Sequence, residues 1–421
     1  MTGGVLEELT WRGLVAVSTD RDAIEKAFAA GPVTYYCGFD PTAPSLHIGN
    51  LVQLLTMRRL QDAGNDPLAL VGGATGLIGD PRMSGERTLN ERDVVEGWVE
   101  RIRSQVQRFL DFDGDHPARM VNNLDWTAPM SAIDFLRDVG KHFRVNRMLA
   151  KESVSARLQS EAGISFTEFS YQLLQGMDFH ELYTRFGCTL QTGGSDQWGN
   201  LTAGIDLVHR TEGVSVHAIA TPLVTKADGS KFGKTEGGAI WLDPEMTSPY
   251  AFYQFWLNAE DAKVVDHLKV FTFRDRDEIA QLEVATTERP QQRAAQRALA
   301  EDVTSLVHGA AAMESARAAS LALFGRGDLA ALDAATLRDA AAELPSATVA
   351  AGPQPLVDLL VATGLATSKS AARRAIGQGS IHLNNVKATD EDAMIGADDL
   401  LHGRWALLRH GRRSLAAVEV G

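Results

Sequence analysis

Cysteine is scarce in this chain, and its two cysteines, Cys37 and Cys188, are far apart in the sequence. Neither belongs to a C-x-x-C pair, so the sequence offers no disulfide framework and no zinc ligand set. No stretch approaches the ~18 consecutive apolar residues that a membrane helix requires. The N-terminal segment 1–14 contains acidic residues and is typical of an amphipathic helix, not of a signal peptide. These absences predict a reducing, cytoplasmic location with no membrane contact.

A general excess of basic charge is also absent. The 421 residues carry a net charge of −13, which argues against a protein that coats nucleic acid with its whole surface. Local basic patches are not excluded, because residues 353–421 contain eight Lys and Arg against seven Asp and Glu. With this length and 44% hydrophobic residues, we expect two to four globular domains.

The order of elements near the N-terminus indicates an α/β fold. Residues 33–39 are β-branched and aromatic and predict a strand, and residues 50–64 have apolar side chains at helical spacing. Residues 66–80 predict a second buried strand that runs into glycines, a pattern that residues 188–200 repeat. Strand, helix and strand in this order predict a Rossmann-like parallel sheet with ligands at the carboxyl ends of its strands.

The rest of the chain predicts three further parts after a catalytic domain at 1–247. Residues 248–324 are almost entirely helical in pattern. Residues 325–352 are rich in alanine and predict a weakly packed helix followed by a linker. Residues 353–421 predict a small α+β domain, in which two helical stretches precede segments that alternate like strands.

The segment 47–50, His-Ile-Gly-Asn, stands where a turn becomes an apolar helix. Ser45 or Asn50 could cap that helix, so a histidine is not needed for capping. A helix N-terminus attracts anions, and Thr42 and His47 add side-chain donors, which suits the phosphates of a nucleotide. Taken alone, His47 could also be a polar loop residue.

A second segment, 222–238, combines three lysines with four glycines. Lys226, Lys231 and Lys234 could close over the charge of a departing pyrophosphate, although alone they could also form a solvated loop. Together, the His-Ile-Gly-Asn segment and Lys-Phe-Gly-Lys-Thr at 231–235 resemble the two signature motifs of the class I aminoacyl-tRNA synthetases. The resemblance implies that the catalytic residues are Thr42, His47, Asn50, Lys231, Lys234 and Thr235.

A predicted helix places Tyr171, Gln175 and Asp178 on one face, at i, i+4 and i+7. Alone, this could be an exposed polar stripe, but the chain resembles the tyrosyl-tRNA synthetases over nearly its whole length. That resemblance implies that Tyr36 and Asp178 bind the phenol of tyrosine, and that Asp80, Tyr171 and Gln175 hold its α-ammonium group. Rejection of phenylalanine, which leaves such groups unpaired, is an established property of this family.

The resemblance also assigns residues to the nucleotide. Cys37 and Asp196 match positions at the ribose of the adenylate, and Gln191 and Gln197 match positions near the carboxyl of the substrate. The ATP and adenylate set implied in this way comprises Cys37, Gly38, Asp40, His47, Gly49, Asn50, Gln191, Asp196, Lys231 and Lys234. Asp40 could instead form the turn before Pro41. Further basic candidates are Arg82 and Arg87.

Two basic groups are candidates for RNA contact. Arg289, Arg293 and Arg297 follow at i, i+4 and i+8 and predict a basic stripe on one helix face, in what the resemblance makes the anticodon-binding region. A solvated helix face would give the same pattern. The tail resembles an S4-type RNA-binding domain, and the charges on it are Lys369, Arg373, Arg374, Lys387, Arg404, Arg409, Arg412 and Arg413.

Taken together, the resemblance implies an enzyme that activates L-tyrosine with ATP and Mg²⁺ and transfers it to the 3′-terminal adenosine of tRNA(Tyr). It also implies a homodimer without a resident metal. The alternatives are a tryptophanyl-tRNA synthetase, disfavoured by Tyr36, Asp178 and the S4-like tail, and a non-catalytic RNA-binding protein derived from a synthetase. Asn50 departs from the histidine frequent at its position, and we expect it to supply a neutral hydrogen bond.

Overall fold

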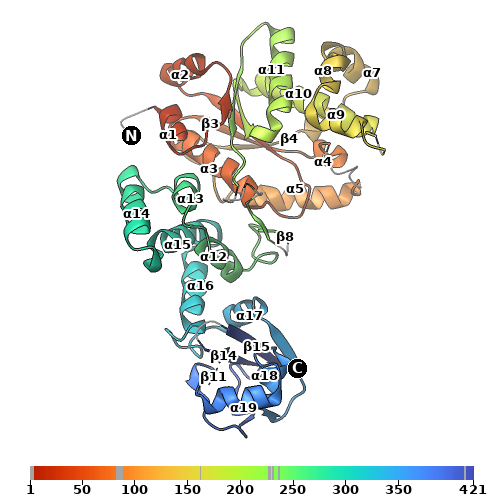
Figure 1. The fold of residues 1–421 in the computed structure, drawn as a ribbon. Coiled ribbons are helices and arrows are strands. Elements are labelled where there is room, and N and C mark those ends of the chain that lie inside the picture. Colours follow the sequence, from red (N-terminus) through yellow and green to blue (C-terminus); the bar gives the residue numbers. More distant parts are fainter. Residues whose placement is uncertain are drawn as a thin grey trace. The chain divides into compact units, whose positions relative to one another are not determined.

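The computed structural model describes residues 4–81, 89–161, 163–225, 229, 232–235, 238–411 and 414–421. It divides into two compact units (Figure 1). Unit 1 comprises residues 1–246 and 262–283, and unit 2 comprises residues 247–261 and 284–421. The segment predicted as one helical domain, 248–324, is therefore shared between the two units.

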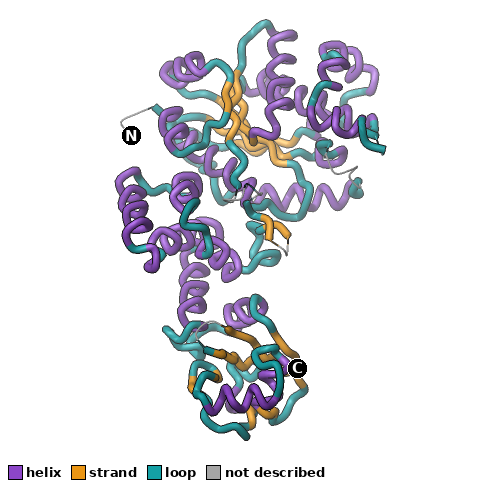
Figure 2. Tube along the Cα trace, in the orientation of Figure 1, coloured by secondary structure: helices purple, strands orange, loops and turns teal. Residues whose placement is uncertain are grey.

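Unit 1 is built on a six-stranded sheet (Figure 2). Its strands, in spatial order, are β1 (Val17–Ser18), β6 (His217–Thr221), β5 (Leu190–Gly194), β2 (Thr34–Phe39), β3 (Asp66–Val71) and β4 (Arg119–Asn122). The five strands from β6 to β4 are parallel, and only the short edge strand β1 is antiparallel to its neighbour. The predicted Rossmann-like parallel sheet is confirmed.

The central strands form where the sequence predicts them. The predicted strand 33–39 is β2, and the predicted helix 50–64 is α3 (Ile48–Asp62). Helix α3 buries Leu51, Leu54 and Leu55 almost completely, and each such side chain contributes roughly 1.5–3 kcal/mol. Strand β2 pairs with β3 on one side and with β5 on the other, so the strand order reverses there. Ligands bind at the carboxyl ends of parallel strands beside such a reversal.

Helices connect and cover these strands (Figure 1). The longest is α10 (Phe166–Phe186), which contacts α11 (Trp198–Glu212). The other α-helices of unit 1 are α1 (Val5–Trp11), α2 (Arg21–Ala30), α4 (Thr75–Ile78), α5 (Arg92–Val106), α6 (Leu124–Thr127), α7 (Ala132–Asp134), α8 (Val145–Leu149), α9 (Glu152–Leu158) and α13 (Val264–Phe271). Two short strands, β7 (Lys234–Thr235) and β8 (Gly238–Ala239), pair in antiparallel fashion.

Unit 2 contains a helical part and a five-stranded sheet. The helical part comprises α12 (Pro249–Leu257), α15 (Ala294–His308), α16 (Ala310–Leu323) and α17 (Ala334–Ala342). Helix α14 (Arg276–Glu288) runs across the boundary between the units. The sheet has the order β12 (Val386–Lys387), β11 (Ile381–Leu383), β14 (Trp405–His410), β15 (Ser414–Val420) and β9 (Ser346–Val349).

Two helices, α18 (Leu356–Ala362) and α19 (Lys369–Gly377), belong to the same C-terminal core as this sheet. A pair of short strands, β10 (Gln354–Pro355) and β13 (Met394–Ile395), completes it. The predicted α+β character of 353–421 is confirmed. None of the described helices is long and apolar enough to cross a membrane.

The predicted linker 325–352 differs in the structure. Helix α17 buries Leu337 completely, and β9 pairs in parallel with β15 as an edge strand of the C-terminal sheet. The composition of the segment did not indicate strand β9. A strand that gains its hydrogen bonds from a partner about seventy residues away need not show a strong local pattern. The segment is part of the folded unit 2.

Candidate functional site

The two sequence motifs meet at the start of α3. The backbone N–H of Ile48 donates to the carbonyl of Ile240 at 3.1 Å, and His47 forms an antiparallel bridge with Trp241. Gly233, in the second motif, lies so close to Ile48 that a Cβ added there would stand 2.6 Å from Ile48 Cγ1. With φ at +84° as well, this position accepts glycine far more readily than any other residue.

His47 and Asn50 form a reciprocal cap on α3. The Nδ1 atom of His47 accepts a hydrogen bond from the N–H of Gly49 at 3.0 Å. The side-chain oxygen of Asn50 accepts one from the N–H of His47 at 3.1 Å. A Cβ at Gly49 would meet the His47 ring at 2.8 Å, which explains the glycine. Asn50 thus makes a neutral hydrogen bond, and its partner in this structure is the protein backbone.

Several predicted phosphate-binding residues lie outside what the structure describes. These are Lys226, Lys231, Arg82 and Arg87, with Arg412 and Arg413 of the tail. For Lys234 and Thr235 only the backbone is described, as strand β7. Thr42, Gly38, Gly49 and Asp196, also predicted at the nucleotide, are exposed near the ends of β2 and β5 or at the start of α3.

Tyr36 on β2 and Asp178 on α10 form a buried polar pair. Their side chains are 1% and 2% exposed. The Tyr36 hydroxyl has no hydrogen-bond partner among the described residues. The charge of Asp178 contributes to raising the pKa of Tyr36, after the larger effect of burial, so the two groups are near each other. Burial raises the pKa of Asp178 to about 7. A phenol and a carboxyl at one buried place can bind a ligand hydroxyl.

Asn123 and Trp126 hold Asp178 in place, and the sequence did not single out either residue. Asn123 Nδ2 donates to one carboxylate oxygen of Asp178 at 3.0 Å, and Trp126 Nε1 donates to the other at 2.9 Å. Asn123 also accepts from the backbone N–H of Ala74 at 2.7 Å. The available signal was the polar pair at 122–123 at the end of a short apolar segment, which the structure shows to be strand β4. Polar residues at the carboxyl ends of parallel strands gather at one edge of the sheet.

Hydrogen bonds continue from Asn123 to Asp40, a residue predicted at the nucleotide. Asn123 Nδ2 donates to Thr75 Oγ1 at 2.9 Å, and Thr75 Oγ1 donates to Asp40 Oδ1 at 2.6 Å. The other oxygen of Asp40 accepts from the Tyr171 hydroxyl at 2.7 Å. Burial, with the charge of Asp40, raises the pKa of Tyr171 well above its usual value, so the phenol remains a donor. Asp40 is therefore part of a side-chain network, and not only a turn former.

Asp80 is the centre of a second cluster. Its carboxylate accepts from Gln197 Nε2 at 3.1 Å and from Asn200 Nδ2 at 3.4 Å. Lys151 Nζ lies 3.6 Å from Asp80 and donates to Asn200 Oδ1 at 2.7 Å. The structure thus brings together Asp80 and Gln197, two predicted tyrosine-binding residues, and adds Lys151 and Asn200. A carboxylate in this position can receive a substrate ammonium group.

Three further predicted residues have buried polar atoms in unit 1. The side-chain oxygens of Gln175 and Gln191 are buried without a hydrogen-bond partner in the described part of the chain. Such acceptors favour a site that a polar ligand completes. The Cys37 thiol is buried on β2, and burial raises its pKa to about 12. It is a neutral thiol, able to make a weak hydrogen bond but unsuited to nucleophilic chemistry.

The predicted basic stripe on one helix is wrong. Arg289 follows the end of α14, Arg293 adopts φ +49° as the N-cap of α15, and only Arg297 lies within a helix. Pro290 is the cause, because proline lacks an N–H and disfavours helical conformation in the preceding residue. Arg293 donates to the backbone carbonyl of Leu257. All three arginines are nevertheless exposed.

The predicted basic residues of α19 lie on a helix with a well-formed N-cap. Ser368 caps the helix by accepting from the N–H of Ala371 at 3.2 Å. Lys369 forms an ion pair with Asp358 at 2.7 Å, and both partners are largely exposed. Arg373 and Arg374 are exposed on the same helix. Exposed pairs of this kind contribute little to stability, so these charges are available to a ligand.

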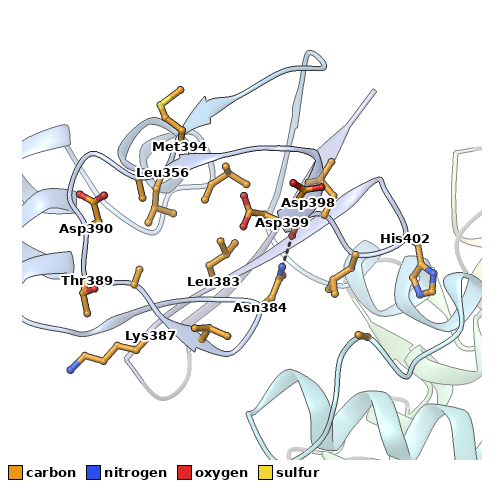
Figure 3. A pocket seen from close by; sticks show the side chains of 17 residues that line it. Leu356, Leu383, Asn384, Lys387, Thr389, Asp390, Met394, Asp398, Asp399 and His402 are labelled. Atoms are coloured by element: carbon orange, nitrogen blue, oxygen red, sulfur yellow. Dashed lines mark hydrogen bonds between the residues drawn. The ribbon is translucent and has the colours of Figure 1, made fainter.

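A cavity of about 590 Å³ lies in the C-terminal part of unit 2 (Figure 3). It contains none of the residues assigned to tyrosine or ATP. Its polar side chains serve the local fold: Asn384 donates to the carbonyl of Asp399, and the Asp399 carboxylate accepts from the N–H of Gly396. Among the described residues, no group of three or more His, Cys, Asp and Glu side chains is placed to hold a metal ion.

Comparison with known proteins gives two family matches. Residues 29–325 match the family described as tRNA synthetases class I (W and Y). Residues 336–418 match the family described as the Tyrosine–tRNA ligase SYY-like C-terminal domain.

Curated relatives match over the whole chain. The tyrosine–tRNA ligase of Streptomyces avermitilis is 66% identical over 417 residues, which is 99% of both chains. That of Mycobacterium tuberculosis is 57% identical over 422 residues, covering 100% of this chain and 99% of the relative. A solved structure, the C-terminally truncated mitochondrial tyrosyl-tRNA synthetase of Coccidioides posadasii, matches with a TM-score of 0.66 and 30% identity. It covers 75% of this chain and 91% of that one.

Proposed function

This chain belongs to the class I tRNA synthetases (W and Y), and on that premise we infer that it is a tyrosine–tRNA ligase. The observation that carries the choice of tyrosine is the buried pair of Tyr36 and Asp178. One group has an unused hydroxyl, and the other has a carboxylate held by two fixed donors. A tyrosine hydroxyl can pair with both groups, whereas the benzene ring of phenylalanine leaves the Tyr36 hydroxyl without a partner and offers no donor to the carboxylate of Asp178.

The first half-reaction joins tyrosine to AMP. The tyrosine carboxylate attacks the α-phosphorus of ATP, a new C–O–P bond forms, and the bond between the α- and β-phosphates breaks to release pyrophosphate. The nucleophile is already ionised, so no general base is required. ATP is a substrate of this family. Mg²⁺ would enter with ATP, because Mg²⁺ is usually bound through substrate phosphates.

The chain contributes position and charge to this step. Asp80, supported by Gln197 and Asn200, would receive the α-ammonium group and so orient the adjacent carboxylate. His47, Lys231 and Lys234 would stabilise the charge that develops on the phosphates. The buried oxygens of Gln175 and Gln191 would accept from the substrate. Asp40 and Tyr171 connect the tyrosine side of this site to its nucleotide side.

The second half-reaction transfers the tyrosyl group to tRNA(Tyr). A hydroxyl of the 3′-terminal ribose attacks the tyrosyl carbonyl, and AMP leaves. Unit 2 would bind the RNA, with Lys369, Arg373 and Arg374 of α19 and the exposed Arg289, Arg293 and Arg297 as candidate phosphate contacts. We place the reaction in the cytoplasm, where tRNA is charged.

The proposal is tested by ATP–pyrophosphate exchange with tyrosine, with tryptophan, and without an amino acid. We expect exchange to depend on tyrosine. Exchange that depends on tryptophan would identify the sister specificity of the same family. Absence of exchange with any amino acid would leave a binding protein that has lost catalysis.

We also propose that the enzyme is a homodimer and that the partner copy docks on residues 133–166. Six large apolar side chains in this stretch are exposed: Ile133, Leu136, Val145, Leu149, Leu158 and Phe166. They lie on α7, the turns after it, α8, α9 and the start of α10, and Figure 1 draws α7, α8 and α9 together at one side of unit 1. Exposed apolar residues at this density favour an interface.

Replacing Ile133 and Phe166 by Asp should convert the dimer to a monomer, measured by sedimentation equilibrium. Asp at position 166 suits the first turn of α10, so the fold of the protein should persist. Leu321→Asp is a matched control, because Leu321 is 42% exposed on α16, away from this stretch of the chain. A wild-type monomer, or an unchanged dimer in the double variant, would contradict the proposed interface.

A further inference from the structure

Helix α13 contacts both the second signature motif and α3, the helix that begins with the first motif. Phe232, inside the Lys-Phe-Gly-Lys-Thr motif, packs on His267 of α13 with ring centroids 4.2 Å apart. Phe271, one turn further along α13, completes the group with centroids 6.2 Å from Phe232 and 6.1 Å from His267. His267 and Phe271 are 3% and 1% exposed, so Phe232 docks on a buried aromatic surface.

Backbone contacts hold the same part of the motif on its other side. The N–H of Phe232 donates to the carbonyl of Val224 at 3.1 Å, and the carbonyl of Gly233 accepts from the N–H of Ile240 at 3.0 Å. Ile240 in turn accepts from Ile48 at the start of α3. Phe232 and Gly233 are therefore fixed between α13 and the first turn of α3.

Two buried arginines hold the C-terminal end of α13. Arg59, on α3, donates to the carbonyl of Thr272 at 2.6 Å. Arg12 donates to the carbonyls of Lys269, Thr272 and Arg274 at 2.8, 3.0 and 2.8 Å. Both guanidinium groups thus satisfy carbonyls at the C-terminal end of α13, where a positive charge is favourable. Helix α3 therefore presents His47 at one end and, three turns later, anchors α13 through Arg59.

We propose that α13 positions the second signature motif relative to the first, and that His267 is the positioning residue that holds Phe232. This inference rests on the proposed function, because it concerns the phosphate-binding lysines next to Phe232 in the sequence. Those lysines must reach the phosphates in the transition state, and a displacement of about 1 Å can cost a hundredfold in rate. Burial lowers the pKa of His267 to about 4, so the ring that Phe232 contacts is neutral at physiological pH.

The test is the steady-state kinetics of tyrosine-dependent pyrophosphate exchange in the full-length enzyme. His267→Ala should lower kcat by roughly 10- to 100-fold, while KM for tyrosine stays within about twofold, because none of the residues assigned to tyrosine belongs to α13. His267→Phe keeps a ring against Phe232 and should recover most of kcat. The double variant Phe232→Ala/His267→Ala should be no slower than the slower single variant.

Val264→Ala provides the matched control. Val264 is completely buried on the same helix, so its truncation should lower thermal stability and leave kcat unchanged. The wild-type enzyme tests the proposed function separately, since it must show tyrosine-dependent exchange first. An unchanged kcat in His267→Ala, additive losses in the double variant, or an equal loss of kcat in Val264→Ala would each overturn the role of His267. If His267→Ala does not fold, His267→Phe is compared with His267→Leu, which has no ring to contact Phe232. Equal kcat values in these two variants would overturn the role of His267 instead.

Discussion

Asp178→Asn should lower kcat/KM for tyrosine activation by about a hundredfold or more and remove most of the preference for tyrosine over phenylalanine. The substitution preserves volume but replaces a carboxylate that accepts two fixed hydrogen bonds, from Asn123 and Trp126. An amide has only one acceptor oxygen, so its NH₂ group must face a donor or the incoming phenol. The measurement is pyrophosphate exchange with each amino acid.

Tyr36→Phe is the companion variant. It removes only a hydroxyl that has no hydrogen-bond partner among the described residues, so it should cost tyrosine activation less than Asp178→Asn does. An Asp178→Asn enzyme that still rejects phenylalanine as the wild type does would show that other groups read the hydroxyl.

The stability of the same Asp178→Asn variant gives an independent readout of burial. The folded pKa of Asp178 is raised from 3.8 to about 7, so between these values the folded protein keeps a proton that the unfolded chain has lost. The contribution of Asp178 to stability therefore falls as pH rises through this window and is constant above it. The loss amounts to at most about 4 kcal/mol. Asp178→Asn should gain stability relative to wild type at pH ~8 and not at pH ~4, measured by denaturant midpoints.

Ending the chain after Leu344 should leave pyrophosphate exchange within about twofold and reduce tRNA charging at least about a hundredfold. This cut retains α12, α15, α16 and α17, and so keeps the buried Leu337 in place. It removes β9 together with the rest of the C-terminal sheet. A cut at residue 353 would instead keep β9 but remove β15, the strand with which it pairs. The variant loses the exposed charges of α19, which we expect to contact tRNA phosphates.

A full-length control separates charge from folding. Arg373→Ala/Arg374→Ala should weaken tRNA binding. It should also reduce the slope of log binding constant against log salt concentration by about two, one for each lost phosphate contact. Arg338→Ala, on the exposed face of α17, removes one arginine elsewhere in unit 2 and should change neither quantity. Undiminished charging by the truncated enzyme would exclude an RNA-binding role for the C-terminal sheet and its helices.

The two wrong predictions have different physical causes. The spacing of Arg289, Arg293 and Arg297 fitted one helix, but Pro290 interrupts the helix between the first two arginines. One proline was therefore enough to break a periodic charge pattern. The segment 325–352 looked like a linker because β9 depends on hydrogen bonds from β15. Periodicity describes neighbours along the chain and carries no information on strands that pair over a long separation.

The sequence by itself determined the parallel sheet, the helix that starts at the His-Ile-Gly-Asn motif and the family. These depend on local patterns, namely apolar runs, caps and short motifs, which involve residues close together in the sequence. Only the tertiary structure decided which groups meet. It placed Asn123 and Trp126 on Asp178, and it left the Tyr36 hydroxyl without a partner in the part of the chain that is described. It also set Gly233 against Ile48, although nearly two hundred residues separate them. Burial creates these relations, because a polar group removed from water must find its partner wherever the fold brings one.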